Sequence, residues 1–148
     1  MNKRMILRIL GIILMLEATF LLLPVLVAVI YRERAGWYYL YTALGCAALG
    51  LVLWRGCRTS LRTIYAREGL VTVALCWIVL SLAGALPFTL CGDIPYYLDA
   101  VFEMVSGFTT TGSSILPNVE ALNHCSLFWR SFSHWIGGMG ILVFMLAL

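Results

Sequence analysis

The stretch Tyr97–Leu116, YLDAVFEMVSGFTTTGSSIL, organises the interpretation of this 148-residue sequence. Its first part, Tyr97–Phe108, has helical periodicity, with apolar residues on one broad face and with Asp99 and Glu103 four positions apart. At 12 residues such a helix would be only ~18 Å long, which is too short to cross a bilayer. The threonines, glycine and serines that follow are small or β-branched residues suited to an extended segment. The stretch therefore predicts a half-helix followed by an extended return.

Composition places the chain among integral membrane proteins. Hydrophobic residues make up 62% of it and charged residues only 11%, whereas soluble domains carry roughly a quarter charged residues. The formal net charge of +3, without a dense basic run, argues against a nucleic-acid partner. The sequence also has no nucleophile–base pair, no Cys or His metal spacing and no phosphate-binding glycine loop, so we expect neither an enzyme nor a bound cofactor.

Four apolar runs are long enough to cross a bilayer as helices. They are Ile9–Ile30, Trp37–Trp54, Gly69–Leu90 and Ser131–Leu148. Small residues that allow close helix contact lie in the second run: Gly45, Ala47, Ala48 and Gly50. We predict an all-α integral membrane fold, in which a two-helix N-terminal hairpin is followed by one helix, a re-entrant loop and a further helix.

Basic residues give the chain an orientation by the positive-inside rule. Arg55–Glu68 holds four arginines and one glutamate, and three basic residues precede the first span. Both segments are therefore predicted to lie in the cytoplasm, and the turn before Tyr97 to lie outside. The chain divides into residues 1–68, the hairpin with its cytoplasmic basic loop, and residues 69–148, the helix–loop–helix repeat.

The physics of the re-entrant stretch favours a monovalent cation. The half-helix would end near Gly107, and the C-terminal carbonyls of a helix favour positive charge. An extended return exposes successive backbone carbonyls, which can replace part of a cation's hydration shell. Gly112 can adopt φ > 0, so that carbonyls turn inward without a Cβ clash. We predict a pore helix over about 97–108 and a filter over about 109–113.

The surroundings of the stretch support the same interpretation. The outer segment between Arg67 and Arg130 has no basic residue and would draw cations toward the mouth. Beyond the span Gly69–Leu90, its acidic residues are Asp93, Asp99, Glu103 and Glu120. A re-entrant loop survives at membrane depth only when it is buried in protein or lines a watery cavity.

Several single residues carry alternative interpretations. Glu17 interrupts the first span and should face other helices, either as a cation or proton site or as a protonated or hydrogen-bonded residue at a helix contact. Cys91 and Cys125 fall on the same outer side, so they form a disulfide or remain free thiols in apolar surroundings. Trp129 and Arg130 are typical of a membrane interface.

Two motifs resemble one known family. DAVFEMVSGFTTTGSSIL at Asp99–Leu116 and WRSFSHWIGGMGILVF at Trp129–Phe144 are similar to the first pore loop and following helix of Trk/Ktr-type potassium transporters, closest to the TrkH/TrkG branch. The resemblance implies a K⁺ channel-like fold of four such repeats and potassium uptake across the bacterial plasma (inner) membrane. It also implies that the two extra helices of this branch correspond to the hairpin.

The resemblance assigns roles to residues of this sequence. Backbone carbonyls of Thr110, Thr111 and Gly112 would form one quarter of a K⁺ filter, and the glycine would favour K⁺ where plant relatives that transport Na⁺ have serine. Glu103 would anchor the pore helix by hydrogen bonds. The glycines within Trp135–Gly140 would let the last helix pack closely beside the pore. His134 has no partner at ligand spacing and is expected to be structural.

The resemblance also implies partners and leaves alternatives open. The family suggests a homodimer, a cytosolic nucleotide-binding regulatory subunit and coupling to H⁺ or Na⁺. Because the chain holds one pore loop where the family has four, we expect a fragment or partial gene product. Two alternatives remain: a subunit that assembles with three copies of itself into a channel, and a non-conducting membrane subunit that uses the loop only for packing.

Overall fold

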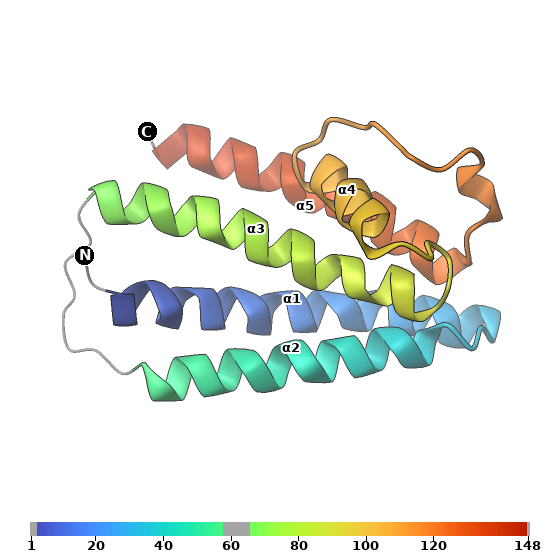
Figure 1. Cartoon of the computed structure of the whole chain (residues 1–148), viewed down its shortest axis with the longest axis horizontal. Coiled ribbons are helices and arrows are strands. Elements are labelled where there is room, and N and C mark those ends of the chain that lie inside the picture. Colours follow the sequence, from blue (N-terminus) through green and yellow to red (C-terminus); the bar gives the residue numbers. More distant parts are fainter. Residues whose placement is uncertain (1–2, 58–65, 148) are drawn as a thin grey trace.

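The computed structural model describes residues 3–57 and 66–147. In these residues the elements are all helical: α1 (Lys3–Tyr31), α2 (Gly36–Gly56), α3 (Ala66–Leu90), α4 (Tyr97–Phe108), the short 3-10 helix η1 (Val119–Ala121) and α5 (His124–Ala147). Figure 1 shows α1, α2, α3 and α5 running lengthwise, with the short α4 beside α3 and α5 and a loop that returns from α4 to α5.

Three helices in the described part of the chain are long and apolar enough to cross a membrane: Lys3–Tyr31, Gly36–Gly56 and Glu68–Leu90. The fourth predicted run lies in α5 as far as Ala147, and its last residue, Leu148, is outside the described residues; the 24 residues of α5 would extend about 36 Å. The prediction of an all-α integral membrane fold is therefore confirmed.

The N-terminal hairpin is held by a close glycine contact between α1 and α2. A Cβ added to Gly50 would lie 2.6 Å from the Gly11 carbonyl oxygen, and one added to Gly11 would lie 2.8 Å from the Gly50 carbonyl oxygen. Only residues without side chains let the two backbones approach this closely. The expected role of Gly50 is confirmed, whereas Gly45 has no atom within 4 Å of an added Cβ and takes no part in the contact.

The short helix α4 buries a mixed face, on which small and polar residues lie beside the large apolar Met104 and Phe108. Ala100, Glu103 and Met104 are at most 1% exposed, whereas Leu98 is 80% and Phe102 is 48% exposed. The buried face packs against α3 and α5, where small residues permit a close approach. Leu98 and Phe102 of the predicted apolar face are therefore turned away from the rest of the described chain, whereas Val101 of that face packs partly against the core.

The last helix begins earlier than the sequence suggested. α5 starts at His124, seven positions before the predicted span, because its first turn is capped by residues of the distant α1–α2 turn. Trp129, which the sequence predicts to be interfacial, does not face the surface of the described chain. Its indole is fully buried and donates a hydrogen bond to the Gly84 carbonyl oxygen at 3.0 Å, which joins α5 to α3.

Candidate functional site

The chain reverses direction immediately after α4 through a left-handed turn at Thr110. The Thr111 N–H donates to the Ser106 carbonyl at 3.0 Å, and the Thr110 N–H donates to the Gly107 carbonyl at 3.0 Å. These two hydrogen bonds form the Schellman motif, a common way for a helix to end. The motif requires positive φ at the residue that follows the helix cap, which here is Thr110. Thr110 meets that requirement with φ 58°, although glycine is the usual residue there. Threonine gives no sequence signal for this turn, so the turn was not predicted.

The return segment, Thr109–Leu116, leaves the turn as an exposed loop. Gly112 has φ 77°, and an added Cβ would meet no atom within 4 Å. Glycine is therefore favoured at this position by the backbone conformation and not by a lack of space for a side chain. Thr111, between Thr110 and Gly112, does not have positive φ, so the sign of φ alternates along the segment.

Glu103 anchors the return segment from behind. Its carboxylate accepts hydrogen bonds from the Ser114 hydroxyl at 3.0 and 3.1 Å and from the Ile115 N–H at 3.2 Å. The side chain is 1% exposed, and the Arg130 guanidinium forms an ion pair with it from α5. The hydrogen bonds expected of Glu103 are present. The pairing of Glu103 with Arg130 was not predicted, because Arg130 lies 27 positions away and its sequence context is typical only of an interface.

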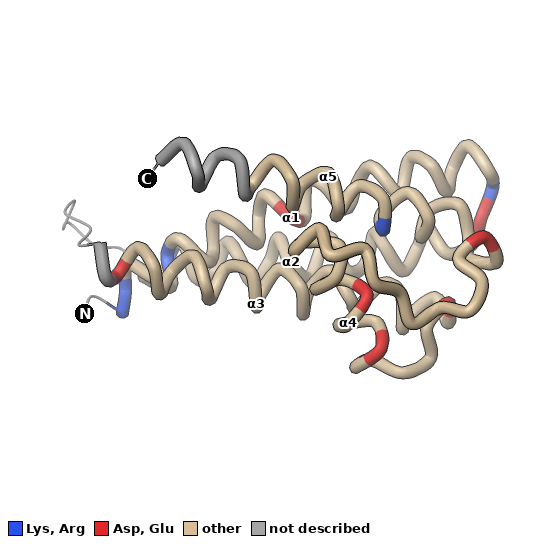
Figure 2. The backbone as a smooth tube through the Cα atoms, turned by 90° about the horizontal axis from the view of Figure 1, so that it is seen from above, with Lys and Arg blue, Asp and Glu red and all other residues tan. Residues whose placement is uncertain are grey.

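This pairing corrects the picture of an acidic mouth. Figure 2 shows acidic residues on α4 and at the end of the molecule away from the N-terminus, as the sequence suggested. However, Glu103 is buried and neutralised by Arg130, so it adds no net negative charge to the surface. Asp93 accepts a hydrogen bond from the Asn123 amide at 2.7 Å within the outer loops.

Further polar contacts fix the shape of the segment. The Ser106 hydroxyl donates to the Ser113 carbonyl at 2.5 Å, which ties the last turn of α4 to the far side of Gly112. The hydroxyls of Thr109 and Thr111 lie 2.8 Å apart and share a hydrogen bond. The segment is therefore held on both sides of Gly112 by short-range bonds to α4.

α5 lies directly against the end of α4. A Cβ added to Gly137 would come within 2.2 Å of the Phe108 carbonyl oxygen, and one added to Gly107 within 2.2 Å of the Ser133 hydroxyl. At Gly137 the atoms in the way belong to the backbone, so a larger residue requires a shift of the helices, whereas at Gly107 the Ser133 side chain would have to move. The close packing expected of the α5 glycines is therefore present at Gly137.

His134 and the cysteines show no ligand geometry. The His134 Nδ1 lies 2.9 Å from the Arg130 carbonyl oxygen, one turn earlier in α5. The described residues contain no group of three His, Cys, Asp or Glu side chains that could hold a metal. Cys91 and Cys125 are free, so the disulfide alternative is wrong; the Cys91 Sγ instead lies 3.8 Å from the Ser126 hydroxyl.

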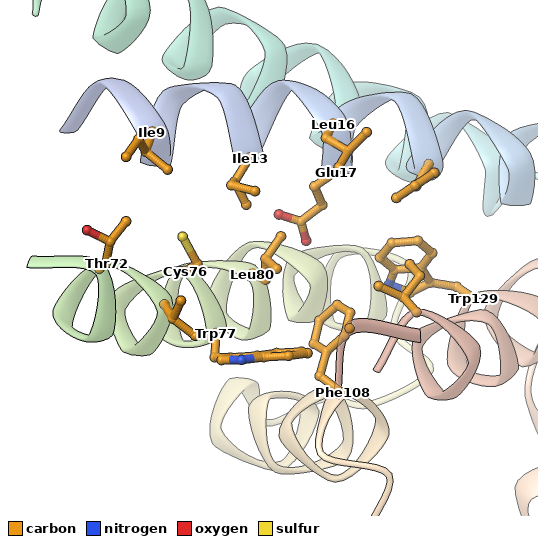
Figure 3. Close-up of a pocket in the computed structure, with 15 residues that line it drawn as sticks. Ile9, Ile13, Leu16, Glu17, Thr72, Cys76, Trp77, Leu80, Phe108 and Trp129 are labelled. Atoms are coloured by element: carbon orange, nitrogen blue, oxygen red, sulfur yellow. The ribbon is translucent and has the colours of Figure 1, made fainter. Parts of the chain in front are cut away.

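Glu17 faces other helices, as expected of a carboxyl group inside a span. It is 2% exposed and lines an apolar cavity of about 450 Å³ between α1, α3 and α5. Figure 3 shows it pointing from α1 toward Leu80 of α3. Neither carboxyl oxygen has a hydrogen-bond partner among the described residues, so a hydrogen-bonded Glu17 is not observed. The protonated residue at a helix contact and the cation or proton site stay predictions.

The hairpin docks onto α5 through Glu33. This carboxylate accepts hydrogen bonds from the backbone N–H groups of His124 at 2.9 Å and Cys125 at 3.2 Å, and it lies 2.8 Å from the His124 Nδ1. Tyr31 stacks on the His124 ring at 4.1 Å. Burial acts to raise the pKa of Glu33, but these hydrogen bonds outweigh it and hold the pKa below the ordinary carboxyl value.

Acidification should weaken this docking. Because the Glu33 pKa is lower in the folded state, its contribution to stability is complete above the ordinary carboxyl pKa of about 4.3 and is lost as the pH falls through the folded-state value. We expect thermal unfolding in detergent to show a steeper loss of stability at acidic pH for the wild type than for Glu33→Gln. The exposed Glu120 provides the control, since Glu120→Gln should retain the wild-type slope. Identical slopes in wild type and Glu33→Gln would contradict the assignment.

A short helix and an anchored return loop between two long helices, within an all-helical chain that has apolar spans, define a polytopic membrane protein. Comparison with known proteins gives the particular family. Residues 40–148 match the family model TrkH, described as cation transport protein. The chain belongs to this TrkH family of cation transport proteins.

Individual relatives agree with this assignment. The chain is 40% identical to the Trk system potassium uptake protein TrkH of Salmonella typhimurium over its whole length, and 43% identical over 93% of its length to an uncharacterized cation transporter of Methanocaldococcus jannaschii. The crystal structure of the potassium transporter TrkH from Vibrio parahaemolyticus matches with a TM-score of 0.92 and 38% identity over 99% of the chain. The chain covers 31% and 29% of the two relatives and 32% of the crystal structure's chain, about three-tenths of their length.

Proposed function

We propose that this chain supplies one wall of the selectivity filter of a potassium uptake transporter. The observation that carries the proposal is the backbone of the return segment, in which the sign of φ alternates and is positive at Thr110 and Gly112. This exposed loop is attached to α4 through hydrogen bonds to Glu103. The names of its relatives as potassium uptake proteins support K⁺ as the ion.

The return segment would bind K⁺ through backbone oxygens. Carbonyls of Thr110, Thr111 and Gly112 would replace part of the hydration shell of the ion, with the alternating backbone turning successive carbonyls toward one side. One loop contacts an ion from one direction only. Three further walls would complete the site, and relatives about three times as long leave room for three more repeats.

The electrostatics of α4 support a cation at this place. The C-terminal end of α4 faces the return segment and carries about half a negative elementary charge. Arg130 is paired with Glu103 on the opposite side of the loop, so its charge is compensated. The proposed site therefore presents dipoles and no uncompensated basic side chain to the ion.

The placement of the protein follows from charge and family. We place it in the bacterial inner membrane with its N-terminus in the cytoplasm, on the basis of the three basic residues near the N-terminus and of the four arginines within Arg55–Glu68. Coupling to H⁺ or Na⁺, a homodimer and a cytosolic nucleotide-binding subunit remain predictions from the family resemblance, and no catalytic step is assigned to the chain.

Gly112→Ser in the complete protein tests the filter assignment. A side chain at φ 77° strains the backbone and shifts the carbonyl orientation, so we expect the preference for K⁺ over Na⁺ to fall about tenfold, or 1.4 kcal/mol. The measurement is ion uptake by cells that lack other potassium transporters, with Na⁺ as the competing ion.

Gly92→Ser is a matched control. Gly92 also has positive φ, 84°, and an added Cβ would likewise meet no atom within 4 Å, but it lies in the turn between α3 and α4. Gly92→Ser should cause a similar backbone strain and leave the preference for K⁺ over Na⁺ unchanged. Unchanged K⁺ uptake and preference in Gly112→Ser would favour the non-conducting alternative, and a purified tetramer of this chain that conducts K⁺ would favour the self-assembled channel.

A further inference from the structure

A second cavity, of about 400 Å³, lies where the end of α1 meets the start of α2. Val25, Val29 and Leu40 form apolar walls, and Arg32 and Arg34 belong to the turn that closes it. Because α1 runs toward this turn and α2 runs away from it, Val25 and Leu40 lie deeper along the helices than the arginines. The cavity is therefore apolar at membrane depth and cationic at the membrane surface.

The two arginines are not neutralised by a close partner. Neither guanidinium forms a hydrogen bond or ion pair within the described part of the chain. Glu33 stands between them in sequence, but its carboxylate is bound to the start of α5 at His124 and Cys125. Two guanidinium groups and one carboxylate leave the site with a net formal charge of +1.

The backbone of the turn is unusual at Arg32. The Glu33 N–H donates to the Ala28 carbonyl at 2.8 Å and the Arg32 N–H to the Val29 carbonyl at 3.3 Å, which closes α1 with the same motif that closes α4. Arg32 has φ 56°, a conformation that favours glycine. The position therefore carries a guanidinium where local backbone energetics favour no side chain.

We propose that this cavity binds one anionic phospholipid. The phosphate diester would lie on Arg32 and Arg34, since guanidinium groups match phosphate oxygens with paired hydrogen bonds. An acyl chain would run along Val25 and Val29 toward the centre of the membrane. Trp37 lines the same cavity and is 62% exposed, as is typical of an indole at the headgroup boundary.

The bound lipid would act on the connection between hairpin and repeat. The same turn holds the carboxylate of Glu33, which caps α5. A lipid that binds only the folded turn stabilises it by mass action. In the orientation proposed above, the lipid belongs to the outer leaflet of the membrane.

Lipid-dependent thermal stability tests the proposal on the complete protein in mild detergent after lipid removal. We expect phosphatidylglycerol to raise the unfolding temperature in a saturable manner, and phosphatidylcholine with the same acyl chains to raise it less. Inorganic phosphate at equal concentration should have no effect. An equal rise with inorganic phosphate would assign the site to a soluble anion and overturn the lipid assignment.

Variants separate the lipid contact from the fold. In Arg32→Gly combined with Arg34→Gln, we expect the apparent affinity for phosphatidylglycerol to fall at least about tenfold. The unfolding temperature without lipid should hold or rise, because glycine suits the positive φ of Arg32. Arg55→Gln, an exposed arginine at the opposite end of α2, is the control and should bind lipid as the wild type does. An unaltered phosphatidylglycerol response in the double variant, or an equal loss in Arg55→Gln, would overturn the proposal.

Discussion

Arg130→Met should destabilise the protein by about 3–5 kcal/mol and abolish potassium uptake by the complete protein. The substitution leaves Glu103, 1% exposed, as a buried carboxylate without its counter-charge. Glu103 also accepts the hydrogen bonds of Ser114 and Ile115, so its rearrangement would release the return segment from α4. Unfolding temperature in detergent and K⁺ uptake in cells would measure the two effects separately.

A second substitution should rescue the first. Glu103→Gln removes the charge and keeps an amide oxygen that can accept from the Ser114 hydroxyl and the Ile115 N–H. In a double-mutant cycle, Arg130→Met with Glu103→Gln should therefore be more stable than Arg130→Met alone. Arg55→Met, at an exposed position, is the control for the loss of one arginine. Additive effects of the two substitutions would show that the pair does not hold the loop.

Gly137→Ala should destabilise the protein by about 1–3 kcal/mol or more and lower ion transport. The new Cβ would lie 2.2 Å from the Phe108 carbonyl oxygen and 2.7 Å from its carbon. Both are backbone atoms of the last turn of α4, so the clash cannot be relieved by a rotamer change. Because Thr110 follows two residues later, the displacement would pass directly into the return segment.

The neighbouring glycine, Gly138, provides a matched control for this prediction. A Cβ at Gly138 would meet only the Thr110 Cγ2 at 3.9 Å, which is an ordinary contact. Gly138→Ala should therefore leave stability unchanged or raise it by up to about 1 kcal/mol, because alanine favours helix more than glycine. Equal unfolding temperatures for the two variants would contradict the close approach of α5 to Phe108.

Local patterns in the sequence were sufficient for the helices. The long apolar runs predicted the membrane helices, and the periodicity of Tyr97–Phe108 predicted a helix with the bounds of α4. Only the ends were less well predicted: α5 begins at His124 because Glu33 caps it from 91 residues away. The site assignment of Thr110, Thr111 and Gly112 stays a prediction, now supported by the backbone geometry of two of them.

Which side of α4 is buried could not be predicted from its hydrophobic pattern. In water, the apolar face would turn inward, but α4 turns Leu98 and Phe102 away from the described chain. Its opposite face carries Glu103, which is buried because Arg130 and the return segment satisfy it. The burial of a charged residue thus depended on a partner 27 positions away, for which the sequence of α4 carries no signal.

The sequence by itself determined that this is a membrane protein with a hairpin, a half-helix and a glycine-bearing return, because these features depend on composition and on periodicity over neighbouring residues. Tertiary structure alone decided the left-handed turn at Thr110, the Glu103–Arg130 pair and the docking of the hairpin through Glu33. Each of these depends on groups brought together from separate helices, or on a backbone conformation that the residue type does not favour. Such contacts are specified by the packing of the whole chain, and no short stretch of it encodes them.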